Sequence, residues 1–246
     1  MKKHFIAMLL VLAPAWAFAM SDSGVHMDEA NIDPNNTASL QRGARLFVNY
    51  CLSCHSAALM RYERIGKDLG IKEKLVADNL VFGGGKVGNL MTVATHPEDA
   101  KEWFGTVPPD LTVIARARGV DWLYNYMRSF YRDDSKIIGV NNLVFPDVGM
   151  PHVLWELQGW QEAVIHTAKK EDGTETKEIT LELAEPGLLT PKEYDRAIRD
   201  LVNFLDYMGE PAKHERRALG VKVIMFLLLL LVLAYLMKRD YWKDVH

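Results

Sequence analysis

Two cysteines and a histidine form the stretch with the clearest chemical meaning, Cys51-Leu52-Ser53-Cys54-His55. Each of two thiols at this spacing can add to one vinyl group of a haem. The imidazole that follows can then ligate the iron from the proximal side. The spacing therefore predicts one haem c that is covalently attached through Cys51 and Cys54, with His55 as an iron ligand.

Two other uses of a Cys-x-x-Cys pair fit the chain less well. A zinc site needs two further thiolate or imidazole ligands at suitable spacing, and the 246 residues contain no other cysteine. A thioredoxin-like redox pair belongs in a βαβ setting, which the sequence pattern does not show. The haem motif uses both cysteines, so we expect no disulfide framework.

The second iron ligand decides the chemistry, because six-coordinate haem transfers electrons and five-coordinate haem leaves a place for small molecules. The candidates are two methionines and three histidines, Met91, Met150, His96, His152 and His166. We favour Met150, which lies between Gly149 and Pro151 in the aperiodic segment 139–152. A thioether ligand stabilises the reduced iron and raises the reduction potential.

Helical periodicity places the haem motif at the end of a helix predicted from about Thr37 to Cys51. Asn36 or Thr37 can cap this helix. Its apolar residues recur at helical spacing, namely Leu40, Ala44, Phe47, Val48 and Cys51. This helix would deliver the two cysteines and His55 to the core.

Further helices are predicted from Pro97, over 108–118, over 121–131 and over 190–208. The last has a capping box, Thr190-Pro191-Lys192-Glu193. The aromatic side chains of 121–131 could line a large planar cofactor, although an ordinary core helix explains each of them equally well. Residues 161–183 predict a β-hairpin around Asp172-Gly173. The chain is therefore mainly α, with one small β-hairpin.

The two ends of the chain predict export and membrane anchoring. Residues 1–19 have the charged start, apolar middle and Ala17-Phe18-Ala19 site of a cleaved signal peptide. Residues 218–237 can span a bilayer as one helix, with Lys222 as their single charge. Basic residues flank both ends of this helix, so the signal peptide must set the orientation.

This orientation predicts a single-pass protein of the bacterial inner membrane. It places a haem domain, 20–217, in the periplasm and a tail, 238–246, in the cytoplasm. The domain 20–217 carries 23 basic and 30 acidic side chains, a net charge of −7. This charge argues against nucleic-acid binding. It could attract a basic protein partner or only keep the domain soluble.

Four stretches together form a family pattern. They are Cys51-Leu52-Ser53-Cys54-His55-Ser56 with Tyr62 after it, Pro108-Pro109-Asp110-Leu111-Thr112 before Ala115-Arg116-Ala117-Arg118-Gly119, Phe145-Pro146 before Gly149-Met150-Pro151, and Tyr235-Leu236-Met237-Lys238-Arg239. The set resembles the cytochrome c1 family, the membrane-anchored haem c subunits of quinol–cytochrome c oxidoreductase. The resemblance covers nearly the whole mature chain.

The resemblance implies a class I cytochrome c core with insertions, followed by one transmembrane helix. It implies that Met150 is the axial ligand opposite His55 and that Arg118 pairs with a haem propionate. It also implies that a carbonyl of the Pro108-Pro109 turn, assigned here to Pro109, accepts a hydrogen bond from the proximal imidazole. The loop between Pro146 and Met150 is shorter than in mitochondrial relatives.

The function implied is electron transfer and not catalysis by this chain alone. One electron would arrive from a Rieske iron–sulfur protein and leave to a soluble cytochrome c, with cytochrome b as a further partner in the complex. We expect any dimer to form only through that complex. An alternative is an anchored c-type cytochrome that serves a terminal oxidase. A five-coordinate peroxidase or gas sensor would require that Met150 not bind the iron.

Overall fold

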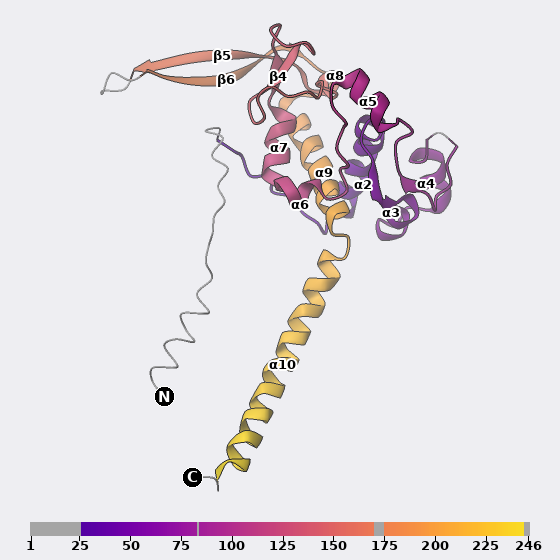
Figure 1. Ribbon diagram of the computed structural model, residues 1–246, viewed down its shortest axis with the longest axis vertical. Coiled ribbons are helices and arrows are strands. Elements are labelled where there is room, and N and C mark those ends of the chain that lie inside the picture. The colour runs from indigo at the N-terminus through magenta and orange to yellow at the C-terminus, as the bar shows by residue number, and fades with distance from the viewer. Residues whose placement is uncertain (1–25, 83, 170–174, 244–246) are drawn as a thin grey trace.

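Helices dominate the computed structural model of the protein, which describes residues 26–82, 84–169 and 175–243 (Figure 1). Three antiparallel two-stranded sheets and one long apolar C-terminal helix complete the described part of the chain. The predicted fold class is confirmed. The predicted signal peptide, 1–19, lies outside the described residues.

The elements follow one another along the chain in a simple order. They are α2 (Thr37–Leu46), η1 (Phe47–Cys51), β1 (Ala57–Arg61), α3 (Tyr62–Asp68), α4 (Glu73–Asn79), β2 (Leu90–Met91), α5 (Pro97–Phe104), α6 (Ile114–Arg118), α7 (Val120–Arg128), β3 (Phe130–Arg132), β4 (Val140–Asn142), α8 (Trp155–Gln158), β5 (Gly159–Lys169), β6 (Glu175–Pro186), α9 (Pro191–Gly209) and α10 (Lys213–Tyr241).

Two long predicted helices are present with their caps. The helix expected over 37–51 is α2 followed directly by η1, a π-helical turn that ends at Cys51. The side chain of Asn36 accepts a hydrogen bond from the backbone of Ser39. Helix α9 begins with the predicted capping box between Thr190 and Glu193. Strong end signals and a clear apolar face made these helices predictable.

Several shorter segments differ from the expectation. Helix α6 begins only at Ile114, because the two prolines at 108 and 109 and the side chain of Asp110 hold the preceding residues in a turn. Helix α7 ends at Arg128, and Phe130 already belongs to β3. The segment 139–152 is not wholly irregular, because its first residues form β4 and pair with β3.

The region 56–96, which lies between the haem motif and the helix predicted from Pro97, contains short elements. Strand β1 pairs with β2, and Ala57 lies opposite Met91. Helices α3 and α4 follow β1 and lie together at one side of the domain (Figure 1). Each helix has only seven residues, too few for a stable periodic signal.

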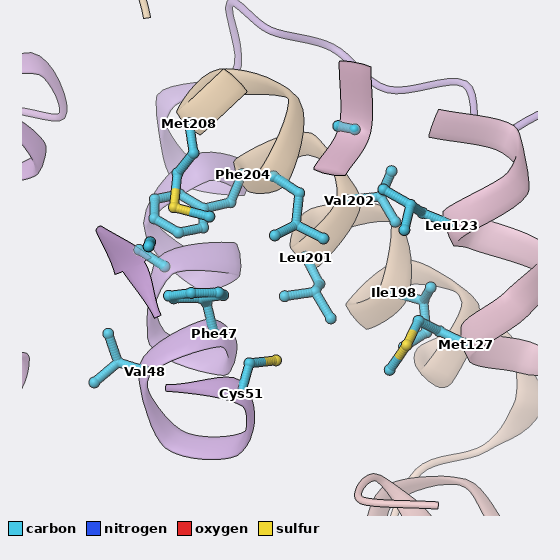
Figure 2. Close-up of a cluster of buried hydrophobic side chains, with 14 of the residues drawn as sticks. Phe47, Val48, Cys51, Leu123, Met127, Ile198, Leu201, Val202, Phe204 and Met208 are labelled. Carbon is cyan, nitrogen blue, oxygen red and sulfur yellow. The ribbon is translucent and has the colours of Figure 1, made fainter. Parts of the chain in front are cut away.

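Helices α2 and α9 cross at close range and form the centre of the core. A Cβ on Gly43 of α2 would overlap the carbonyl oxygen of Asp200 on α9, so only glycine permits this approach. The carboxylate of Asp200 accepts hydrogen bonds from Ser39 and Arg42 across the same crossing. Apolar side chains of α2, η1, α7 and α9 fill the adjoining space (Figure 2).

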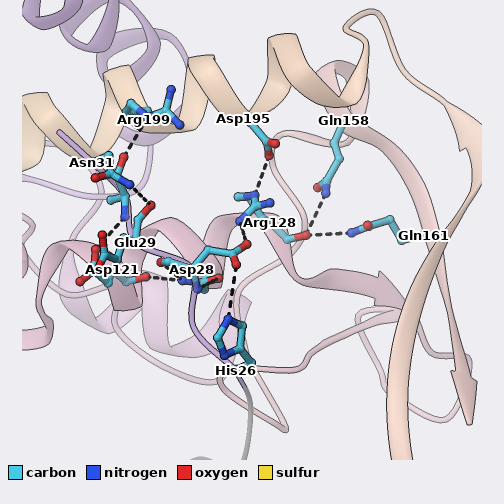
Figure 3. A network of polar contacts seen from close by, with 12 residues as sticks. His26, Asp28, Glu29, Asn31, Asp121, Arg128, Gln158, Gln161, Asp195 and Arg199 are labelled. Carbon is cyan, nitrogen blue, oxygen red and sulfur yellow. Dashed lines mark hydrogen bonds and ion pairs between the residues drawn. The ribbon is translucent and has the colours of Figure 1, made fainter. Parts of the chain in front are cut away.

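The residues 26–36 form an irregular arm that is bonded to two helices (Figure 3). The backbone N–H of Ala30 donates to Asp121 on α7, and its carbonyl accepts from Arg199 on α9. Arg128 of α7 donates to Asp28 of the arm and to Asp195 of α9. The arm therefore fastens α7 to α9.

Strands β5 and β6 form the predicted hairpin, which projects from the domain (Figure 1). The strands are longer than the predicted range 161–183, because pairing already starts with Gly159 opposite Pro186. The turn predicted at Asp172-Gly173 lies outside the described residues.

Helix α10 leaves the domain on the side opposite the hairpin (Figure 1). Its stretch Glu215–Tyr241 is long and apolar enough to cross a membrane, and none of it is buried within the protein. Ion pairs join its start to the end of α9, from Lys213 to Asp206 at 2.8 Å and from Arg216 to Glu210 at 2.6 Å. The helix is longer than the predicted span 218–237 at both ends.

We expect Gly43→Ala to destabilise the folded protein by about 2 kcal/mol, because the added methyl group forces α2 away from α9. Thermal unfolding of the detergent-purified holoprotein, followed by circular dichroism, should show a Tm lower by roughly 4–8 °C for a chain of this size. Gly88→Ala is the matched control, since a Cβ there meets nothing within 4 Å. Equal Tm values for the two variants would contradict the close crossing.

Candidate haem site

The two cysteines and the histidine lie in one turn at the end of η1. The backbone N–H groups of Cys54 and His55 both donate to the carbonyl of Cys51, at 3.1 and 2.9 Å. Cys51 is buried beside the core, whereas Cys54 is exposed (Figure 2 shows Cys51). A single turn therefore presents two thiols and an imidazole within a short length of chain.

Burial raises the pKa of the Cys51 thiol to about 12, and the neighbouring Cys54 adds to the effect. A thiol with this pKa stays protonated at neutral pH. It is then a poor nucleophile for disulfide exchange and a poor thiolate ligand for zinc. The environment of Cys51 thus disfavours the two alternative uses of the motif and is compatible with a thioether.

The imidazole of His55 is oriented by the main chain. Its Nδ1 lies 2.8 Å from the carbonyl oxygen of Pro109, and a carbonyl can only accept, so Nδ1 carries the proton. Burial lowers the pKa of His55, against the opposing effects of the Pro109 bond and the charge of Asp110. The neutral ring therefore keeps a lone pair on Nε2, which is the form that ligates a metal.

The turn that carries the Pro109 carbonyl is tied to the residues that follow His55. Asp110 accepts hydrogen bonds from the backbone N–H groups of Ala58, at 2.7 Å, and Thr112, at 2.8 Å. The N–H of Leu111 donates to the carbonyl of Ser56 at 2.8 Å. These bonds explain why an aspartate follows the two prolines.

Met150 lies after β4 in a loop that comes close to the segment leading into this turn. A Cβ on Gly149 would be 3.7 Å from the methyl carbon of Thr106. Thr106 precedes Pro109 by three residues, so their Cα atoms are at most about 11 Å apart. His55 and the Met150 loop thus contact the two ends of one short segment.

The sulfur of Met150 has a polar partner that the sequence did not reveal. The hydroxyl of Tyr126 on α7 lies 3.4 Å from Sδ and donates to it. Burial raises the pKa of Tyr126, so this hydroxyl keeps its proton at neutral pH. The helical pattern indicated that Tyr126 faces the interior, but only the tertiary structure shows which atom its hydroxyl meets.

Arg118, at the end of α6, lies over two aromatic rings. Its guanidinium carbon is 5.0 Å from the centroid of Trp122 and 5.8 Å from that of Phe145. Trp122 in turn stacks on Tyr126, with centroids 4.9 Å apart. Arg118 is exposed. Its head group is therefore placed next to the aromatic side chains that lead to Met150.

His152, two residues after Met150, is buried and held between aromatic rings. It stacks on Phe130 with centroids 5.0 Å apart and planes 3° from parallel, and it meets the edge of Trp160. Burial lowers the pKa of His152 to about 4, so the ring is neutral. These contacts make His152 a packing residue of the loop that carries Met150.

The other ligand candidates lie in settings that suit a metal less well than the Met150 loop does. Met91 is fully buried in β2, opposite Ala57. His96 is the exposed residue that precedes α5. His166 lies on the projecting hairpin, where its Nε2 is 2.9 Å from the hydroxyl of Thr180.

Comparison with known proteins now gives the family. The Cytochrome C1 family is matched over residues 91–245. A cytochrome c1 of Allochromatium vinosum is 52% identical over 246 residues, the full length of both chains. The chain belongs to the cytochrome c1 family.

Two further relatives extend the comparison. A protein of Nitrosomonas europaea named ammonia monooxygenase gamma subunit is 48% identical over 242 residues, 98% of each chain. A cytochrome c1 of Rhodospirillum rubrum is 24% identical over 282 residues, which cover 99% of this chain and 97% of the relative.

Membership in the cytochrome c1 family identifies the chain as an electron-carrier subunit of the cytochrome bc1 complex with a covalently bound haem c. The residues present fit this cofactor. One turn carries the thiols of Cys51 and Cys54 and the neutral imidazole of His55, whose Nε2 is available. The nearby loop offers the half-buried thioether of Met150. When bound, the haem supplies a one-electron couple that the side chains themselves lack.

We expect Asp110→Ala to loosen the turn that orients His55. The amides of Ala58 and Thr112 lose their acceptor, and a bond to a charged group is worth about 1.5 kcal/mol or more, so their hydrogen exchange should accelerate roughly tenfold. Exchange of the peptides around 58 and 112, measured by mass spectrometry, tests this. Asp78→Ala, which removes only an exposed ion pair to Lys74, should leave both peptides unchanged. Unaltered exchange in Asp110→Ala would contradict the assignment.

Proposed function

We propose that the protein passes electrons one at a time from a Rieske iron–sulfur protein to a soluble cytochrome c, through a haem c ligated by His55 and Met150. The observation that carries the proposal is that His55 bonds to Pro109 while Gly149, the neighbour of Met150, lies next to Thr106, so both ligand residues come close to one short segment. With the imidazole of His55 and the thioether of Met150 as its two protein ligands, a haem iron would be six-coordinate, which favours electron transfer over substrate binding.

In this proposal, each remaining site residue binds the haem or orients one of its ligands. Cys51 and Cys54 attach the porphyrin through thioethers. The carbonyl of Pro109 keeps the proton of His55 on Nδ1 and so directs Nε2 to the iron. Arg118 pairs with a propionate, a charge-assisted contact for which its exposed guanidinium is available. None of these residues makes or breaks a bond in a substrate.

The arrangement relative to the membrane follows from the two ends of the chain. We propose that 1–19 is a cleaved signal peptide, that the domain 20–217 lies in the periplasm, that 218–237 spans the inner membrane and that 238–246 is cytoplasmic. Helix α10 is apolar and projects from the domain, as such an anchor requires (Figure 1). The net charge of −7 on 20–217 would attract a basic soluble cytochrome c.

Purification of the chain from its native membranes in mild detergent tests the proposed electron route. We expect it to bring along a multi-span protein with b-type haem and an iron–sulfur subunit. Recovery with copper-containing oxidase subunits would instead favour an anchored cytochrome that serves a terminal oxidase. Recovery with subunits of an ammonia monooxygenase would point to the activity in the name of the Nitrosomonas europaea relative.

We expect Met150→Ala to remove one iron ligand while the thioethers of Cys51 and Cys54 retain the haem. The reduced variant should bind carbon monoxide, and its reduction potential should fall by more than 59 mV, a tenfold change in the equilibrium constant. Optical titration and carbon monoxide difference spectra measure both effects. Met225→Ala, on the exposed face of α10, is the control. A Met150→Ala variant that behaves like the wild type would exclude Met150 as the ligand.

A further inference from the structure

We propose that Tyr126 is a positioning residue for Met150 and that the hydrogen bond from its hydroxyl to Sδ raises the reduction potential of the haem. The inference rests on the proposed ligation of the iron by Met150. The family pattern found in the sequence does not include Tyr126. The inference instead comes from one contact, the 3.4 Å separation between the Tyr126 hydroxyl and the Met150 sulfur.

The direction of this hydrogen bond follows from the two groups. A thioether sulfur has lone pairs but no proton, so it can only accept, and the phenol must donate. Sulfur has two lone pairs, so Sδ can accept from Tyr126 with one and ligate the iron with the other. The hydrogen bond and the metal bond therefore do not compete for the same electrons.

The hydrogen bond should favour the reduced form of the iron. A donated proton draws electron density from the sulfur, which makes Met150 a weaker donor to ferric iron. The positive end of the O–H dipole points at the proposed ligand sulfur, and there it would also destabilise the additional charge of the oxidised iron. The surroundings are largely buried, so this electrostatic effect is less screened than in water.

Aromatic contacts fix the hydroxyl in this position. Trp122 stacks on one side of the Tyr126 ring, with centroids 4.9 Å apart, and Phe130 meets it edge-on at 5.2 Å. Only 9% of Tyr126 is exposed. The ring cannot easily rotate away, so the hydroxyl remains directed at the sulfur.

The loop that carries Met150 has a second attachment that does not need this hydroxyl. Beyond Pro151, the ring of His152 stacks on Phe130. Phe130 also contacts Tyr126, so α7 and β3 hold the loop on both sides of Pro151. Removal of the hydroxyl alone should therefore leave Met150 close enough to bind the iron. The effect of the hydroxyl on the reduction potential can therefore be tested separately from the binding of Met150 to the iron.

The deciding variant is Tyr126→Phe in the detergent-purified holoprotein, which keeps the ring and removes the hydroxyl. We expect the equilibrium constant for reduction to fall about three- to tenfold, a decrease in potential of roughly 30–60 mV at 59 mV per tenfold change. The absorption band of methionine-ligated ferric haem should persist, and the reduced variant should not bind carbon monoxide. Tyr124→Phe is the control, since Tyr124 is buried on the same helix and faces Arg128.

Three results would overturn the inference, and they can be told apart. An unchanged potential in Tyr126→Phe with the methionine band intact would mean that the hydroxyl does not tune the iron. An equal decrease in Tyr124→Phe would assign the effect to general loosening of α7. Loss of the methionine band in Tyr126→Phe, but not in the wild type, would mean that the change in potential comes from loss of the Met150 ligand. By contrast, absence of the band from the wild-type protein would refute ligation by Met150 itself.

Discussion

The hydrogen bond from His55 to the carbonyl of Pro109 is the constraint on which the site depends. It determines which ring nitrogen carries the proton, and hence which nitrogen is left to bind iron. The bond requires the turn at 108–112 to stay beside the strand that follows the haem motif. The side chain of Asp110 and the carbonyl of Ser56 provide this attachment by accepting hydrogen bonds from the backbone N–H groups of Ala58 and Leu111. The proposed metal ligand His55 is thus oriented by a main-chain atom.

The crossing of α2 and α9 supports the haem motif through the helix that precedes it in the chain. Gly43 allows the two backbones to approach, and Asp200 joins them through Ser39 and Arg42. Helix α2 leads through η1 directly to Cys51, so the position of the first thiol follows from this crossing. Continuing along the chain, α9 ends in acidic residues that pair with the start of α10. The haem motif and the membrane helix are therefore both fastened to α9.

The features that the sequence predicts well are those with a local physical cause. The capping box at Thr190 and the periodic apolar face of 37–51 marked α9 and α2 because caps and periodicity act within a few residues. The pairing of β3 with β4 and of β1 with β2 involves two or three residues per strand, too few for an alternating pattern. The partner of Tyr126 is 24 residues away, and no local rule relates them.

The two proposed ligands differ in how they are held, and this difference bears on the control of the potential. His55 is oriented by a backbone carbonyl, which a substitution at Pro109 or elsewhere would not remove. Met150 is held by side chains, through the hydroxyl of Tyr126 and through the stacking of His152 on Phe130. Side chains can change one at a time without refolding the domain. Adjustment of the potential within this fold should therefore occur chiefly on the methionine side.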